Sequence, residues 1–178
     1  MDLVPVPKWS RDRLARALIE AEQRLFEVGL TGIAEAGLTG DEIALLDSMH
    51  QHGALQLRIY AMISLQDTLA MRGALARGPL VQPRLQVRSV KCYSDGALAS
   101  RGACLFEPYS DRAHHHGALL YDSITLHRWA REIYDAGFQL NTHAIGDSAN
   151  AVMLQIYDQI IPDTADVRWR IEHAQIVR

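Results

Sequence analysis

Residues 123–143, SITLHRWAREIYDAGFQLNTH, contain one helix and the strand that follows it. The helical part carries apolar side chains at the three- and four-residue spacing of an amphipathic helix: Leu126, Trp129, Ile133 and Tyr134. Gly137 ends the helix, and residues 138–143 form the short apolar run that is typical of a strand. A further strand is expected at residues 85–93, LQVRSVKCY. Strand, helix and strand in this order predict a unit of a parallel sheet.

The same alternation of strands and helices extends through the rest of the chain. Ser10 is expected to cap the first helix, Thr39 and Glu42 to form a capping box on the second, and Asp147 to cap the last. The short run at residues 31–35 is interpreted as a buried strand. We expect helices at residues 11–28, 40–52, 67–76, 123–136 and 147–161, strands at 31–35, 55–63, 85–93, 138–143 and 167–173, and an irregular segment at 94–122.

Length and composition indicate one globular domain over residues 1–178. The chain has 178 residues, of which 48% are hydrophobic, and 18 basic side chains stand against 21 acidic ones. This mixed charge predicts no binding to nucleic acid or to an anionic membrane. The N-terminal residues MDLVPVPKWSRDR lack the apolar core of a signal peptide, and only two cysteines are present. We therefore expect a cytoplasmic protein without a disulfide framework.

Three residues suited to a metal centre fall near the ends of predicted strands. Lys91 lies late in one strand, and His143 and His173 end the next two. The two histidines are 30 residues apart, about one strand–helix unit, so they can lie on adjacent strands. Imidazole nitrogens are common ligands of divalent ions. The alternative is that both histidines are hydrogen-bonded packing residues and that the lysine keeps a sheet edge soluble.

The other histidines and the cysteine of residues 85–93 are interpreted as structural. The run His114–His116 lies in the irregular segment and is interpreted as a solvated loop, with opportunistic metal binding as the alternative. His50 and His52 flank a helix end, where a positive charge suits the helix dipole. Strand alternation sends Cys92 to the face opposite the neighbouring lysine, as a buried apolar side chain. The sequence has no phosphate-binding loop, dinucleotide fingerprint, nucleophile elbow or HExxH motif.

Three motifs together resemble amidohydrolase family 3, the branch of the metal-dependent amidohydrolases that contains enzymes similar to N-substituted formamide deformylase. The first motif is VKCYSDGALASRGA at residues 90–103, followed by EPYSD at 107–111. The next two are NTHAIGD at 141–147 and RIEHAQ at 170–175. The resemblance implies a partial (β/α)8 TIM barrel, an α/β fold of which this chain supplies approximately strands two to six with the intervening helices.

The resemblance also implies a metal centre and its chemistry. The family's strand-four lysine, which can be carboxylated to bridge two metals, falls on Lys91, and the histidines of strands five and six fall on His143 and His173. One or two divalent metals, with zinc as the first candidate, would activate water to hydrolyse a C–N bond of a small amide-type substrate. Asp95 and Arg101 would help to shape the substrate pocket or to order the loop that covers it, and an ordinary turn with a loop salt bridge is the alternative. Tyr109 would line the same pocket.

The resemblance places further metal ligands outside residues 1–178. It implies an HxH pair upstream and a strand-eight aspartate downstream, so the chain is interpreted as a central fragment that is inactive by itself. Two alternatives remain open. The chain can be a non-catalytic piece that forms homo-oligomers through its open sheet edges, or it can be a metal-binding remnant. Glu172, next to His173, is interpreted as a structural partner, since strand alternation points the two side chains in opposite directions.

Overall fold

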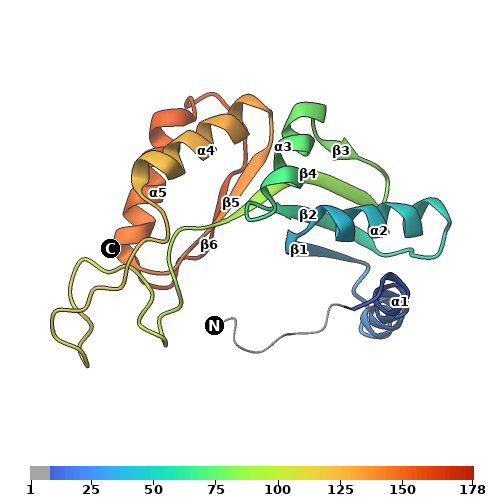
Figure 1. Ribbon diagram of the computed structural model, residues 1–178, viewed down its shortest axis with the longest axis horizontal. Coiled ribbons are helices and arrows are strands. Elements are labelled where there is room, and N and C mark those ends of the chain that lie inside the picture. The colour runs from blue at the N-terminus through green and yellow to red at the C-terminus, as the bar shows by residue number, and fades with distance from the viewer. Residues whose placement is uncertain (1–8) are drawn as a thin grey trace.

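A computed structural model describes residues 9–178 of the chain, and Figure 1 shows its elements. The N-terminal stretch judged to lack a signal-peptide core falls largely in residues 1–8, outside this part. The helices are α1 (Arg11–Glu27), α2 (Gly40–Gln51), α3 (Thr68–Arg77), α4 (Ser123–Asp135) and α5 (Asp147–Ile160). The strands are β1 (Gly32–Leu38), β2 (Arg58–Ser64), β3 (Leu80–Val81), β4 (Leu85–Tyr93), β5 (Gln139–Ala144) and β6 (Arg170–His173). No helix of residues 9–178 is both long and apolar enough to cross a membrane.

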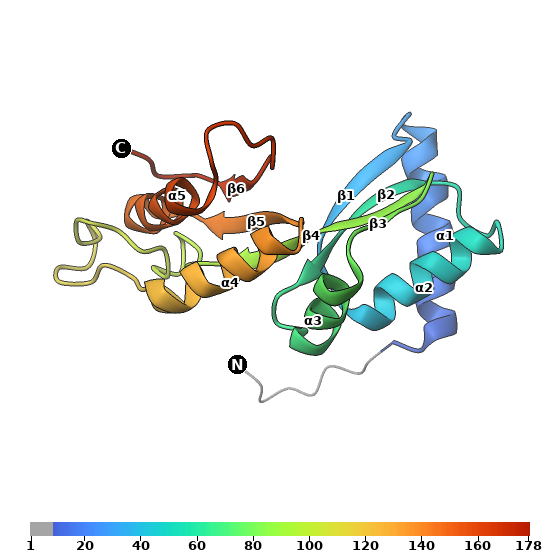
Figure 2. The same cartoon turned by 90° about the horizontal axis from the view of Figure 1, so that it is seen from above.

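The main sheet is parallel and open. Its strand order is β1-β2-β4-β5-β6, and each neighbouring pair in that order is parallel. The two-residue strand β3 pairs with β4 in the antiparallel direction. The sheet curves in Figure 2 as it passes from β1 to β6, with helices following the strands along its outside. This arrangement is part of a (β/α)8 barrel, as the sequence predicted.

The two faces of the sheet differ in chemistry. One face packs against the helices and forms the apolar core, to which Ile59, Val90, Cys92 and Leu140 contribute from three strands. The opposite face is mostly polar, with Met62 as an apolar member; its polar residues on β2, β4, β5 and β6 are Ser64, Ser89, Lys91, Asn141, His143 and Arg170. This second face, called the inner face below, is the one that a closed barrel would turn toward its axis.

Helix starts agree with the sequence prediction at two places and disagree at one. Ser10 and the capping box of Thr39 and Glu42 accept the expected backbone N–H groups. Asp67, which was expected inside the third helix, is the N-cap residue of α3. The prediction for Asp147 was wrong, because Gly146 is the N-cap residue of α5 and makes no side-chain capping bond. The carboxylate of Asp147 instead accepts hydrogen bonds from the N–H groups of Phe106 and Ser148.

Two strands differ from their predictions. β1 was expected to be buried, but most of its residues are exposed, since it forms an outer edge of the sheet and pairs only with β2 within residues 9–178. β3 was not predicted, because two residues are too short to show a pattern. Strand β1 also continues past the predicted end at residue 35 to Leu38, with Gly37 inside it, and composition could not tell an edge strand from a central one.

The irregular segment 94–122 is closed at its base and attached to helix α5. A backbone bridge joins Asp95 and Leu119, near the two ends of the segment. Further along, the carbonyl oxygen of Cys104 accepts from the N–H groups of Ser148 and Ala149, at 3.2 and 3.3 Å, in the first turn of α5. A Cβ on Gly146 would lie 2.0 Å from that same oxygen, so only glycine permits this approach. The segment thus lies against the carboxyl ends of the strands, where sites form in such sheets.

Candidate metal centre

Lys91 is the most buried charged side chain of the inner face. It lies on β4, its side chain is 4% exposed, and its Nζ makes no hydrogen bond or ion pair with any other group of residues 9–178. Burial lowers its pKa below the usual value, an effect that the nearby carboxylate of Glu172 partly opposes. The nearest aromatic ring is that of Tyr93, whose centroid lies 5.2 Å from Nζ. A buried lysine with a lowered pKa is a candidate functional residue.

His143 and His173 lie side by side at the ends of β5 and β6. Their ring centroids are 4.6 Å apart in an edge-to-face arrangement. In register, His143 pairs with Glu172 while His173 pairs with Ala144, so simple alternation would point the two histidines to opposite faces. His173 has a φ of 79° and Ala174 a φ of 42°, and this left-handed backbone breaks the alternation. The sequence predicted the pair but not the backbone turn that brings it together.

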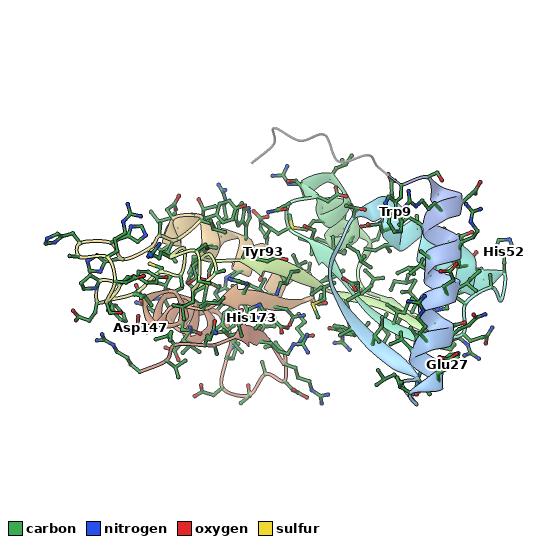
Figure 3. All side chains as sticks on the ribbon, turned by 90° about the horizontal axis from the view of Figure 1, so that it is seen from below. Trp9, Glu27, His52, Tyr93, Asp147 and His173 are labelled. Carbon is green, nitrogen blue, oxygen red and sulfur yellow. The ribbon has the colours of Figure 1, made fainter. Side chains whose placement is uncertain are left out.

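Burial favours the neutral form of His143. Desolvation lowers its pKa below the usual value, and the nearby His173 and Lys91 act in the same direction. The carbonyl of Gly96 and the carboxylate of Asp95 oppose the shift. A neutral imidazole has a lone pair that can bind a cation. Figure 3 shows His173 and Tyr93 together in the part of the molecule that is remote from α1.

Glu172 belongs to the same face as Lys91 and was not singled out as a site residue. It pairs with His143 in the register of β5 and β6, and its Oε1 is 3.0 Å from the Arg170 guanidinium. That ion pair lacks hydrogen-bond geometry, so Oε1 stays a buried acceptor without a hydrogen bond among residues 9–178. The expectation that Glu172 and His173 point apart failed at the left-handed turn. Aligning residues 170–173 with β5 in parallel register, which pairs Glu172 with His143, could have placed Glu172 beside the site.

A layer of polar and sulfur groups underlies these residues. Asn141, opposite Lys91 in register, donates to the sulfur of Met62 at 3.2 Å and accepts from Arg170 Nε at 3.2 Å. The hydroxyl of Tyr60 donates to Gln139 in the next row toward the strand beginnings. These contacts hold the inner face in one arrangement below the lysine and the histidines.

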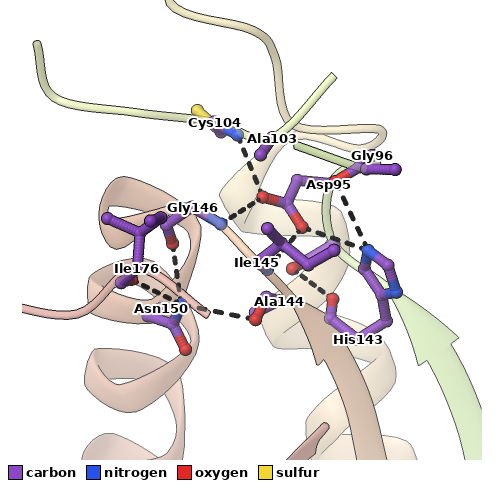
Figure 4. A network of polar contacts seen from close by, with 12 residues as sticks. Asp95, Gly96, Ala103, Cys104, His143, Ala144, Ile145, Gly146, Asn150 and Ile176 are labelled. Atoms are coloured by element: carbon purple, nitrogen blue, oxygen red, sulfur yellow. Dashed lines mark hydrogen bonds and ion pairs between the residues drawn. The ribbon is translucent and has the colours of Figure 1, made fainter. Parts of the chain in front are cut away.

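The predicted substrate residues occupy different environments. Asp95 is buried at the carboxyl end of β4 and touches His143, as Figure 4 shows. Tyr109 is buried in the irregular segment, where burial raises its pKa and its hydroxyl donates to the carbonyl of Ala103. Arg101 is exposed and forms a salt bridge with Asp111 at 2.7 Å, whereas Asp95 takes no part in that salt bridge. A role in substrate binding remains a prediction for all three.

Other histidines bind backbone groups. His50 contacts the carbonyls of Leu46 and Leu57, while His115 and His116 contact carbonyls within the segment 94–122. Within residues 9–178 no group of three or more His, Cys, Asp or Glu side chains is arranged to hold a metal ion. Lysine is not among those donor types. Lys91 could join the two histidines as a third ligand only as a carbamate, which would supply oxygen donors. Two imidazole nitrogens together with carbamate oxygens would suit a divalent metal that accepts mixed nitrogen and oxygen ligands.

Comparison with known proteins identifies the fold and the family. The model of the amidohydrolase family matches residues 2–178. The chain belongs to the amidohydrolase family. Protein LONG AFTER FAR-RED 3 of Arabidopsis thaliana is 28% identical over 190 residues, covering 98% of this chain and 33% of that protein. The putative amidohydrolase YtcJ of Bacillus subtilis is 34% identical over 95 residues, covering 53% of this chain and 18% of that protein.

Two crystal structures share the fold of this amidohydrolase chain. Uncharacterized metal-dependent hydrolases from Pyrococcus horikoshii and Pyrococcus furiosus superpose with TM-scores of 0.82 and 0.81, each at 26% identity over 96% of this chain. The chain covers 34% and 35% of those two structures, so it spans about a third of their length. The partial-barrel prediction and the family resemblance are both confirmed.

Proposed function

We propose that residues 1–178 supply the middle part of the active centre of a metal-dependent hydrolase that cleaves a C–N bond of a small amide-type substrate. The observation that carries the proposal is the pair of histidine rings, 4.6 Å apart, beside a buried lysine on the adjoining strand. Zinc is the first candidate because it accepts both imidazole nitrogen and carboxylate-like oxygen. When bound, such a metal acts as a Lewis acid that activates water and polarises the substrate carbonyl.

The side chains of the centre are prepared for this role by their surroundings. Burial lowers the pKa of His143, which favours the neutral imidazole and its lone pair. Burial likewise lowers the pKa of Lys91, which enlarges the fraction of neutral amine. The neutral amine can add CO₂ with release of a proton, and the resulting carbamate would offer two oxygens. Both free cysteines suit the reducing cytoplasm, where we propose that the protein acts.

Zinc binding by the purified chain tests the assignment. We expect about one zinc per chain, lost in the double variant His143→Ala/His173→Ala. The matched control is His114→Ala/His116→Ala, which also removes two histidines, in this case from the irregular segment. Zinc content after dialysis is measured by elemental analysis and folding by circular dichroism. Unchanged zinc content in the first double variant, or loss of zinc in the control alone, would show that His143 and His173 do not hold the metal.

The activity of the chain by itself is a separate proposal. We expect purified, zinc-loaded residues 1–178 to show no amide hydrolysis, because the resemblance implies six metal ligands and only three of them match residues of this chain. A panel of N-acyl amino acids, formamides and cyclic amides is incubated with the protein, and released amine is measured. Hydrolysis that disappears in the His143→Ala/His173→Ala variant would contradict this expectation while supporting the hydrolase assignment.

A further inference from the structure

Asp95 is fixed in place by three backbone hydrogen bonds. Its side chain is 1% exposed. Oδ2 accepts from the N–H groups of Cys104 and Gly146 at 2.9 and 2.8 Å, and Oδ1 accepts from the N–H of Ile145 at 3.0 Å. Figure 4 shows these bonds converging on the carboxylate from the irregular segment and from the turn between β5 and α5. A carboxylate held from two directions cannot rotate away without breaking these bonds.

The same carboxylate faces one nitrogen of the His143 ring. Oδ1 of Asp95 lies 3.5 Å from Nε2, and the carbonyl oxygen of Gly96 lies 3.5 Å from the same nitrogen. Both neighbours are acceptors, so a lone pair on Nε2 would face two negative oxygens, whereas an N–H would be attracted to both. The neutral ring is therefore expected to carry its proton on Nε2, which leaves the lone pair on Nδ1.

We propose that Asp95 is a positioning residue for His143: its carboxylate fixes the Nε2–H tautomer and the ring orientation, so that Nδ1 is the nitrogen available to a divalent metal. A carboxylate or carbonyl behind a metal-binding histidine commonly has this effect. The role of Nδ1 toward a metal rests on the proposed function, whereas the tautomer is a property of the metal-free chain.

Asp147 provides a matched comparison for this role. Like Asp95 it is a buried aspartate, 7% exposed, whose carboxylate joins the irregular segment to the start of α5 through backbone N–H groups. Its other contact is an ion pair with Arg178 at 2.7 Å, and none of its recorded contacts within residues 9–178 reaches a histidine. If Asp95 only attached the irregular segment to the start of α5, as Asp147 does, replacing either aspartate should have the same effect on His143.

The first experiment needs no variant of Asp95. The metal-free chain is labelled with ¹⁵N-histidine, and the ring nitrogens of His143 are identified by their loss in His143→Gln. Long-range ¹H–¹⁵N spectra, recorded at mildly alkaline pH where the ring is neutral, then report which nitrogen carries the proton. We expect Nε2–H alone. Predominant Nδ1–H in the unmodified chain would overturn the proposal, whether or not any variant folds.

The second experiment compares Asp95→Asn with Asp147→Asn. The single oxygen of an asparagine at position 95 is expected to take the place of Oδ2, which accepts two N–H groups, so its amide N–H would face Nε2 of His143. That arrangement favours a lone pair on Nε2, and we expect the population of the Nε2–H tautomer to fall severalfold. Zinc affinity should fall by about 10- to 100-fold. Asp147→Asn should change neither quantity.

The outcomes separate the positioning role from the proposed function. Unmodified chain that shows Nε2–H but binds no zinc would retain the positioning role and reject the metal centre. An unchanged tautomer in folded Asp95→Asn, or an equal change in Asp147→Asn, would reduce Asp95 to a loop fastener. Thermal unfolding of both variants shows whether each is folded, and if Asp95→Asn is not, predominant Nδ1–H in the unmodified chain would still overturn the proposal.

Discussion

Burial acts on single side chains in opposite directions on the two faces of β4. Lys91 and Cys92 are neighbours in sequence, and each is almost fully buried on its own face. Burial lowers the pKa of the lysine ammonium and raises the pKa of the cysteine thiol to about 12. Both shifts favour the neutral form, since a low-dielectric environment disfavours charge. The neutral amine is a possible nucleophile toward CO₂, whereas the neutral thiol is unreactive.

The two cysteines should therefore react differently with a thiol reagent. Cys92 is buried with a raised pKa, and Cys104 is partly exposed. We expect one thiol to react rapidly in the folded chain at mildly alkaline pH and both to react in denaturant. Ellman's reagent provides the measurement. Cys104→Ser should abolish the rapid reaction and Cys92→Ser should leave it, so the reverse pattern would contradict the packing of β4.

At the scale of elements, one aspartate links the starts of two helices. Asp67 is the N-cap of α3 and accepts from the N–H of Ala70 at 3.1 Å. Its second oxygen accepts from the N–H of Gly40, in the first turn of α2, at 2.9 Å. These two bonds lower the pKa of Asp67 below 3.8 in the folded chain. Asp67, which the sequence marked only as the start of a helix, thus joins the first turns of α2 and α3.

Replacing Asp67 should remove a pH-dependent stabilisation. A group whose folded pKa is lowered stabilises fully above its unfolded pKa of 3.8, and the contribution is lost as the pH falls through the lower folded value. We expect Asp67→Ala to reduce the free energy of unfolding by about 1 kcal/mol near neutral pH. The deficit should shrink as the pH is lowered below 3.8.

Urea unfolding near neutral pH and in acid measures this difference. Asp158→Ala, an exposed substitution on α5, is the control. A deficit of the same size at both pH values would show that the Asp67 carboxylate does not act through its charge.

The turn before α5 requires a glycine at position 146. Gly146 lies against the carbonyl of Cys104, and an added Cβ would lie 2.0 Å from its oxygen. Gly146→Ala should therefore force the irregular segment away from α5 and cost about 1–3 kcal/mol of unfolding free energy. Gly32→Ala is the control, because its nearest contact would be an ordinary 3.4 Å. Chemical denaturation compares the two variants, and equal stability would refute the close approach.

Local sequence patterns predicted the elements better than the site. Ser10, Thr39 and Gly137 mark boundaries through short-range hydrogen bonds or backbone freedom, so the sequence suffices for them. The pairing of His143 with His173 followed from strand spacing and the family resemblance. The contacts of Asp95 and Glu172 could not be predicted, because they join residues that are brought together only by the sheet register and by the left-handed turn at His173.

At the scale of the whole molecule, the sheet has two outer strands without a second partner. Within residues 9–178, β1 pairs only with β2 and β6 pairs only with β5. Most of β1 is exposed. Unpaired strand edges favour association with other strands. We therefore keep self-assembly through these edges as a proposal for the behaviour of the chain in isolation.

A charge placed on the β1 edge should weaken such assembly. Ala34 is an exposed residue of β1, and we expect Ala34→Lys to shift the chain toward monomer because an edge lysine opposes strand pairing. Ala151→Lys, on the exposed surface of α5, adds the same charge elsewhere and should have no effect. Light scattering over a range of concentrations measures the mass. A monomeric unmodified chain at every concentration would exclude assembly through the edges.

The junction between the irregular segment and α5 has a consequence for how this region can diverge. The group that satisfies the first turn of α5 is the backbone carbonyl of Cys104, which every amino acid possesses. Substitution at this position therefore leaves the junction intact. The number of residues between Asp95 and Cys104 is more constrained than the identity of residue 104, because both residues must reach the same turn around Gly146. An inserted or deleted residue between Asp95 and Cys104 would move one of the two away from this turn and weaken the attachment of the loop to the helix.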